Sequence, residues 1–292
     1  MSSLKLVGYY LYGMGLAFVD EKQLTAGATM KRIFASLALM GALTACGISQ
    51  QQEVEMGQDY ARQINSQLPI VSDPEVNRYI NVLGDQIASR TSRADLDWRF
   101  YVVDSREVNA FAVPGGFIYV NRGLIERTKR MDELAGVLGH EIGHVVRRHS
   151  IEQMEKAQGA NVGVTLACIL TSICNSQVAG AAINIAGGAV FARFSRQDEL
   201  EADQEAVANT VRSGISPQGI VTMFQTLIAE RRSRPGAVEG WFATHPLEED
   251  RIAAAQATIN SIPSSQRNSL TANSSNYNSF VSRVRSLPAP RQ

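Results

Sequence analysis

This 292-residue chain has no excess of positive or negative charge, and it contains few histidines. The 28 Lys and Arg residues balance 28 Asp and Glu residues, so the formal net charge is zero. Without a basic run or patch, the chain lacks the electrostatic footprint of a nucleic-acid-binding protein. Only four histidines occur, and three of them fall within residues 140–149. Histidines that are so scarce and so closely spaced indicate a site rather than general surface composition.

Long apolar runs are equally scarce. Residues 33–43 are apolar but too short to span a membrane comfortably, and they follow the basic pair Lys31 and Arg32. The run leads into Leu-Thr-Ala-Cys46, which has the order of a bacterial lipoprotein signal. We therefore expect residues 30–45 to be a signal peptide and Cys46 to carry lipid in the periplasm, with sorting to the outer membrane. The alternatives are an ordinary secretory signal and a buried helix with an incidental cysteine.

A signal at position 30 leaves residues 1–29 to be explained. We expect Met30 to be the native start and residues 1–29 to be an upstream mis-start extension, the alternative being an additional membrane-associating segment.

Of the three cysteines, Cys168 and Cys174 stand six apart, about 240° around a helix, so a disulfide between them requires a turn. Free thiols remain the alternative.

The rest of the chain shows mainly helical patterns. Residues 46–260 are expected to form one α+β domain, mostly helical with a small antiparallel sheet. A Ser- and Asn-rich tail at residues 261–292 is expected to follow it and to be poorly ordered apart from a short helix within 280–284. The apolar, Ala- and Gly-rich composition of residues 160–192 predicts packed helices or a mobile helical hairpin, and a membrane-contacting loop is the alternative. The predicted helices cover residues 52–66, 132–149 and 197–211 and begin at 73–74 and 216–217, and the extended segments cover 98–103, 109–113 and 117–120.

A metal-binding motif lies in the predicted helix of residues 132–149. His140 and His144 enclose Glu141 in an H-E-x-x-H pattern. Histidines four residues apart lie about 40° apart around a helix, so both rings can reach one zinc ion. If the helix continues, His149 falls on the core side and is not expected to be a ligand.

A catalytic zinc needs a third protein ligand. Glu199 is preferred, because Glu199 and Asp203 share a helical face with two alanines that permit close packing against the histidine helix. Glu201 and Glu205 point to the opposite side, as solvated acidic residues would. We therefore predict one Zn²⁺ per chain, held by His140, His144 and Glu199. Glu141 is then the general base, while Asp203 either supports a ligand histidine or donates a proton.

The motifs together resemble a known family. The series is Asn109-Ala-Phe-Ala-x-Pro-Gly-Gly116, the H-E-I-G-H motif with Arg148-His149 after it, E-x-x-A-D at residues 199–203, and Thr244-His245-Pro246. It is similar to the M48 zinc metallopeptidases, of the periplasmic lipoprotein type related to the β-barrel assembly-enhancing proteases but without their helical-repeat domain. The resemblance implies a gluzincin-like domain, catalytic roles for Glu141 and Asp203, and a histidine at 245 that is a fourth ligand, a regulator or a transition-state stabiliser. A capping role for His245 before Pro246 stays open.

The expected function follows from this resemblance. It implies an endopeptidase of the bacterial cell envelope whose substrates are unfolded or misassembled proteins, with the membrane contacted through the lipid on Cys46 and no nucleic acid as partner. An edge strand at Asn109, Ala110 and Phe111, or alternatively residues 117–120, would hold an extended substrate by β-augmentation. The competing hypothesis is an envelope chaperone or binding module with a latent zinc site. A different zinc hydrolase, such as an amidase, fits the metal motif but none of the other motifs.

Overall fold

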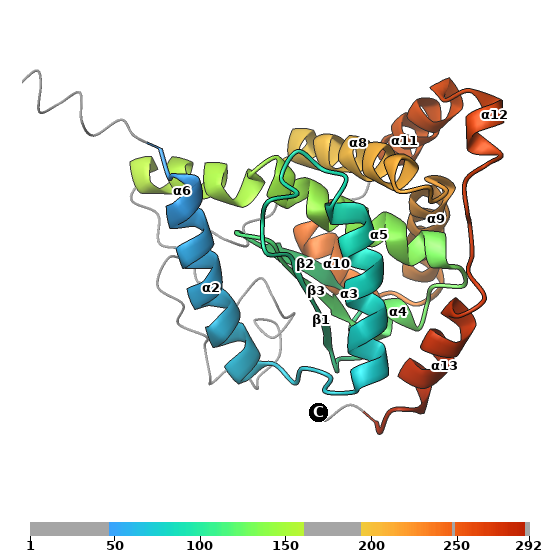
Figure 1. Ribbon diagram of the computed structural model, residues 1–292, viewed down its shortest axis with the longest axis horizontal. Coiled ribbons are helices and arrows are strands. Elements are labelled where there is room, and N and C mark those ends of the chain that lie inside the picture. Colours follow the sequence, from blue (N-terminus) through green and yellow to red (C-terminus); the bar gives the residue numbers. More distant parts are fainter. Residues whose placement is uncertain (1–46, 161–193, 247–248, 290–292) are drawn as a thin grey trace, which may run out of the picture. The chain divides into compact units, whose positions relative to one another are not determined.

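A computed structural model describes residues 47–160, 194–246 and 249–289 of the chain (Figure 1). The described part is mostly helical around a small sheet, which confirms the predicted α+β class. Three strands, β1 (Arg99–Val103), β2 (Ala110–Val113) and β3 (Phe117–Asn121), form the sheet. The helices are α2 (Gln50–Gln67), α3 (Pro74–Ala88), α4 (Arg122–Ile125), α5 (Met131–Val146), α6 (His149–Ala160), α8 (Arg196–Arg212), α9 (Gln218–Ser233), α10 (Glu239–Thr244), α11 (Glu249–Ser261), α12 (Ser264–Arg267) and α13 (Tyr277–Ser286).

The sheet is mixed, and the expectation of an antiparallel sheet was wrong for one pair of strands. The order is β1-β3-β2, with β2 antiparallel and β1 parallel to β3. The Pro-Gly-Gly turn after β2, in which Gly115 and Gly116 have φ of 82° and 99°, folds β3 back beside β2 as a hairpin. The connection from β1 to β2 passes the end of β3, so β1 joins the free side of β3 in the parallel direction.

Each face of the sheet is covered by helices, as the alternation of its side chains requires. Phe100, Val102, Ile118 and Val120 point into the main core, together with residues of α3, α5 and α9. The alternate residues of the strands, Phe111 and Tyr119 among them, pack in a second cluster with residues of α2 and α6. The sheet is thus held between two helical layers (Figure 1).

Helices α5 and α8 approach each other closely. A Cβ placed on Gly143 would lie 2.9 Å from the carbonyl oxygen of Ala202, and one on Gly139 would lie 3.2 Å from the Cα of Ala206. Glycines on α5 therefore face alanines on α8, as the small residues of the second helix predicted. This close packing brings the functional side chains of the two helices within bonding range of one metal ion.

Most of the predicted elements are confirmed. Asp73 caps α3 by accepting hydrogen bonds from the backbone of Glu75 and Val76, with Pro74 in the first turn. In the tail, the short helix predicted within residues 280–284 is confirmed as part of the longer α13, whereas α12 forms in a stretch that was expected to be poorly ordered. Helix α13 is anchored because four apolar side chains at helical spacing enter the main core, namely Tyr277, Phe280, Val281 and Val284.

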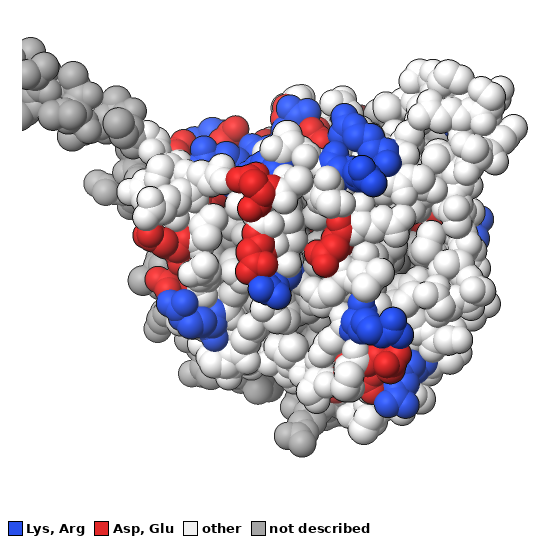
Figure 2. All heavy atoms as spheres, in the orientation of Figure 1, with Lys and Arg blue, Asp and Glu red and all other residues white. Residues whose placement is uncertain are grey.

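Several predictions lie outside the described residues: the extension at 1–29, the signal peptide at 30–45, lipidation of Cys46, residues 161–192 of the apolar segment, and the pairing of Cys168 with Cys174. Within the described residues, no helix is both long enough and apolar enough to cross a membrane. On the face shown in Figure 2, acidic and basic side chains are interspersed over the described surface, as the zero net charge suggests.

Candidate metal centre

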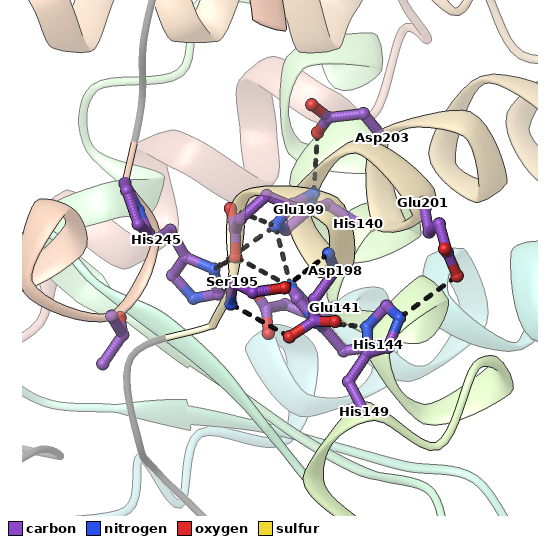
Figure 3. Close-up of polar contacts among 12 residues, drawn as sticks. His140, Glu141, His144, His149, Ser195, Asp198, Glu199, Glu201, Asp203 and His245 are labelled. Atoms are coloured by element: carbon purple, nitrogen blue, oxygen red, sulfur yellow. Dashed lines mark hydrogen bonds and ion pairs between the residues drawn. The ribbon is translucent and has the colours of Figure 1, made fainter. Parts of the chain in front are cut away.

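Four side chains from three parts of the chain converge at one point inside the protein. His140 and His144 come from α5, Glu199 from α8, and His245 from the residue after α10 (Figure 3). Their potential ligand atoms all lie within 4.8 Å of one another. The H-E-x-x-H histidines and the predicted third ligand are therefore brought together, and His245 joins them.

The spacing of these atoms fits a tetrahedral zinc ion. Ligand atoms at the usual zinc distances lie about 3.3–3.6 Å apart around a tetrahedron. The Nε2 atoms of His140 and His144 are 3.1 Å apart, and Glu199 carboxylate oxygens lie 3.6 Å and 3.4 Å from them. Neutral imidazole nitrogens and a carboxylate are also the donor set that zinc prefers, so the residues present fit the metal.

His245 completes the set through its Nδ1 atom. This nitrogen lies 3.3 Å from His140 Nε2 and 3.1 Å from a Glu199 oxygen. The ring stacks on Trp241, with centroids 4.6 Å apart, and only 1% of the residue is exposed. Of the roles that the sequence left open, a fourth ligand is the one for which this position is suited.

Glu141 lies beside the metal set but is not part of it. Its carboxylate is fully buried, and neither oxygen makes a hydrogen bond within the described part of the chain. The nearest charged or titratable contact is His245 Nε2, 3.5 Å from Oε1. Burial raises the pKa of Glu141, which suits a group that must both accept and release a proton.

Asp203 lies behind His140, on the side away from the metal position. Its Oδ1 is 2.9 Å from His140 Nδ1, the nitrogen that faces away from the other ligands (Figure 3). A carboxylate at this place fixes the tautomer and orientation of a ligand histidine. Of the two roles that the sequence left open for Asp203, the geometry favours support of His140 over proton donation.

Arg251 is a buried residue behind the metal set that no motif in the sequence singled out. Its guanidinium is fully buried and donates to both oxygens of Asp203, at 2.8 Å each, and to Glu199. It also donates to the carbonyl of Pro246, 2.8 Å away, directly after His245. Arg251 thus contacts the ligand Glu199 and also Asp203, which supports the ligand His140. Its bond to Pro246 fixes the segment that carries His245. No spacing pattern in the sequence marks Arg251.

Electrostatic effects in the site oppose one another. Burial lowers the pKa of His144 well below its usual value, so this ring is neutral and able to bind metal. Burial alone would raise the pKa of Glu199, but His245, His144 and Arg251 outweigh it and hold that pKa well below the usual range. Burial alone would lower the pKa of His245, and the carboxylates of Glu199 and Glu141 raise it instead.

The predicted substrate strand lies at an edge of the sheet. Strand β3 is central and pairs on both sides, so residues 117–120 have no free edge for a peptide. Residues 70–71 contact the outer side of β1 through backbone hydrogen bonding and an isolated bridge to Val103. Among the described strands, none pairs with the outer side of β2. Ala110 and Phe111 lie in this strand, and Asn109 directly precedes it.

Comparison with known proteins agrees with this geometry and with the resemblance in the motifs. Residues 74–259 match the model of peptidase family M48. The chain is 34% identical over 230 residues to the β-barrel assembly-enhancing protease of Escherichia coli strain K12, covering 76% of this chain and 46% of that protein. It therefore spans about half the length of such relatives.

Two shorter proteins of the same bacterium are also similar. The metalloprotease YcaL of strain K12 is 33% identical over 187 residues, covering 58% of this chain and 71% of YcaL. The metalloprotease LoiP is 26% identical over 211 residues, covering 72% of this chain and 81% of LoiP. The aligned region is thus common to metalloproteases of different lengths.

Proposed function

The chain belongs to peptidase family M48, and from that membership we propose that it is a zinc-dependent endopeptidase of the bacterial cell envelope that cleaves unfolded or misassembled proteins. The observation that carries the proposal is the convergence of His140, His144, Glu199 and His245 beside the unbonded carboxylate of Glu141. A purely structural zinc site needs ligands only. A buried carboxylate without a hydrogen-bond partner is costly, and a role in turnover explains why the site contains one.

In this mechanism His140, His144 and Glu199 hold the metal. When bound, zinc supplies Lewis-acid activation of a water molecule and of the scissile carbonyl. Glu141 accepts the proton of the attacking water and returns it to the amine that leaves. Asp203 keeps Nδ1 of His140 protonated, so that Nε2 faces the metal.

Strand β2 is proposed as the place where substrate binds. An extended peptide paired with its outer edge would be held mainly by backbone hydrogen bonds, which read little sequence. Such broad recognition suits unfolded chains. The envelope assignment is supported by the lipoprotein-like segment ending at Cys46 and by similarity to proteases whose names refer to β-barrel assembly. Lipid on Cys46 would anchor the protein to the outer membrane from the periplasmic side.

A chelator experiment on the full chain tests the proposal. We expect the purified protein to contain one zinc per chain and to cleave casein. A strong chelator should abolish cleavage, and stoichiometric Zn²⁺ should restore it, because Glu141 can take a proton only from a water molecule that the metal activates. Zinc binding without any cleavage would instead favour the envelope chaperone with a latent zinc site.

His245 makes that latent state a specific hypothesis. With Nδ1 in the metal set and only 1% of the residue exposed, His245 would occupy the position that a water molecule needs. We expect His245→Ala to raise the initial rate of casein cleavage while one zinc per chain is retained. A fall in that rate at unchanged zinc content would contradict this role, and would make His245 a participant in turnover.

A further inference from the structure

The chain turns sharply directly after the H-E-x-x-H helix. Helix α5 ends at Val146, and α6 begins at His149. Between them, Arg148 adopts a φ of 59°, a left-handed conformation that ends the first helix. The turn places the ring of His149 against His144, with their Nδ1 atoms 2.9 Å apart (Figure 3). Both residues are buried, at 2% and 1% exposure.

The tautomers of the two rings follow from the metal set. His144 turns its Nε2 toward the other ligands, so in a metal-bound ring the hydrogen sits on Nδ1. Two ring nitrogens 2.9 Å apart attract each other only if one of them donates a hydrogen. His149 must therefore accept at Nδ1 and carry its own hydrogen on Nε2. That Nε2 makes no hydrogen bond within the described residues, and the group that it faces is the carboxylate of Glu201, with an oxygen 3.6 Å away.

We propose that His149 and Glu201 are positioning residues for the metal ligand His144, a role that rests on the proposed zinc site. His140 is supported directly by the carboxylate of Asp203. On its side away from the metal set, the Nδ1 atom of His144 contacts the ring of His149, and the carboxylate of Glu201 lies beyond that ring. Each of the two histidine ligands is then oriented from behind by a negative charge on α8, which fixes its tautomer and strengthens it as a donor.

The surroundings of His144 show why this support matters. Phe194 stacks on the His144 ring, with centroids 3.9 Å apart and planes 21° from parallel. Stacking on one face fixes the plane of the ring but does not choose which nitrogen carries the hydrogen. An acceptor at His149 Nδ1 stabilises the His144 tautomer that metal binding at Nε2 requires. Glu201 could be mistaken for a solvated residue because it points away from Glu199, yet α6 brings His149 to its side.

Zinc affinity of His149→Phe tests the proposal. Phenylalanine keeps a buried ring but removes the acceptor nitrogen. In the full chain we expect the zinc dissociation constant, measured by competition with a chromophoric chelator, to rise about 10- to 100-fold. The substitution leaves the buried Nδ1 of His144 without its acceptor, so the thermal midpoint of the zinc-free protein should fall, and the dissociation constants are compared at a temperature at which both proteins are folded. A dissociation constant equal to that of the wild type would overturn the proposal, whereas a wild type that binds no zinc would overturn the proposed function instead.

Glu201→Gln, with Glu205→Gln as the matched control on the same helix, tests the carboxylate. We expect a smaller rise in the dissociation constant for Glu201→Gln, because the contact is longer and the side chain is 31% exposed. Glu205 binds Arg147 and Asn209 and should leave zinc affinity unchanged. Equal dissociation constants for the two variants would remove Glu201 from the proposal.

The tautomers themselves can be observed without any substitution. With only four histidines, a chain labelled with ¹⁵N in histidine gives four imidazole patterns in long-range ¹H–¹⁵N spectra. In the zinc-bound protein we expect hydrogen on Nδ1 of His144 and on Nε2 of His149. Hydrogen on Nδ1 of His149 would overturn the proposal even if the variants failed to fold.

Discussion

Replacing Glu141 by glutamine is expected to lower the rate of casein cleavage by about 10²- to 10⁴-fold, the usual contribution of a general base, and to leave zinc content unchanged. Glutamine has the size of glutamate but cannot accept the proton of water. Glu141 is not among the four residues whose ligand atoms converge, so its loss does not remove a ligand. The measurement is the initial cleavage rate together with zinc per chain by atomic absorption.

Folding stability separates this result from simple damage. Burial raises the pKa of Glu141, which means that the ionised carboxylate is costly where it stands. A neutral amide should therefore not lower the thermal midpoint of unfolding. Glu205→Gln, a change of the same kind outside the metal set, should keep both cleavage and zinc. Loss of zinc in Glu141→Gln would make Glu141 a ligand, and full activity would remove it from the mechanism.

The part of the site that could be predicted from the sequence is the part fixed by helix periodicity. Two histidines four residues apart, and a glutamate on the small-residue face of a second helix, are oriented by local geometry alone. The structure brings His140, His144 and Glu199 together as that geometry requires. The fold class followed from the same periodicity. The buried face of α13 also shows helical spacing in its four apolar residues, but the many Ser and Asn residues around them make that pattern hard to recognise.

What could not be predicted depends on contacts between distant segments. The parallel pairing of β1 with β3 is decided by packing, since no turn joins the two strands. The position of His149 depends on a helix break at Arg148, a residue with no bias toward positive φ. Arg251 acts only because α11 packs on α8, and a single arginine in a helix has no local signal of burial.

The second large effect is expected for Arg251→Met. Methionine fills a similar length of apolar space but leaves Asp203 and Glu199 without their buried cation. Removing one partner of a buried ion pair typically costs about 3–5 kcal/mol, because the remaining charge is unpaired in a dry interior. We expect a loss of this size in the free energy of unfolding of the zinc-free protein at neutral pH, measured with urea. Bound zinc should offset part of it by neutralising Glu199.

A second substitution decides whether charge or packing causes the loss. Asp203→Asn removes one of the stranded charges while its amide oxygen can still accept from His140. If uncompensated charge is the cause, the double variant Arg251→Met and Asp203→Asn should be more stable than Arg251→Met alone. If the double variant is no more stable, the packing of Arg251 against Phe224 is the larger contribution. Arg78→Met, in an exposed pair with Glu75 on α3, should change stability little. The difference between the stability losses of Arg251→Met and Arg78→Met would then measure how much the burial of Arg251 beside the metal centre contributes to the free energy of unfolding.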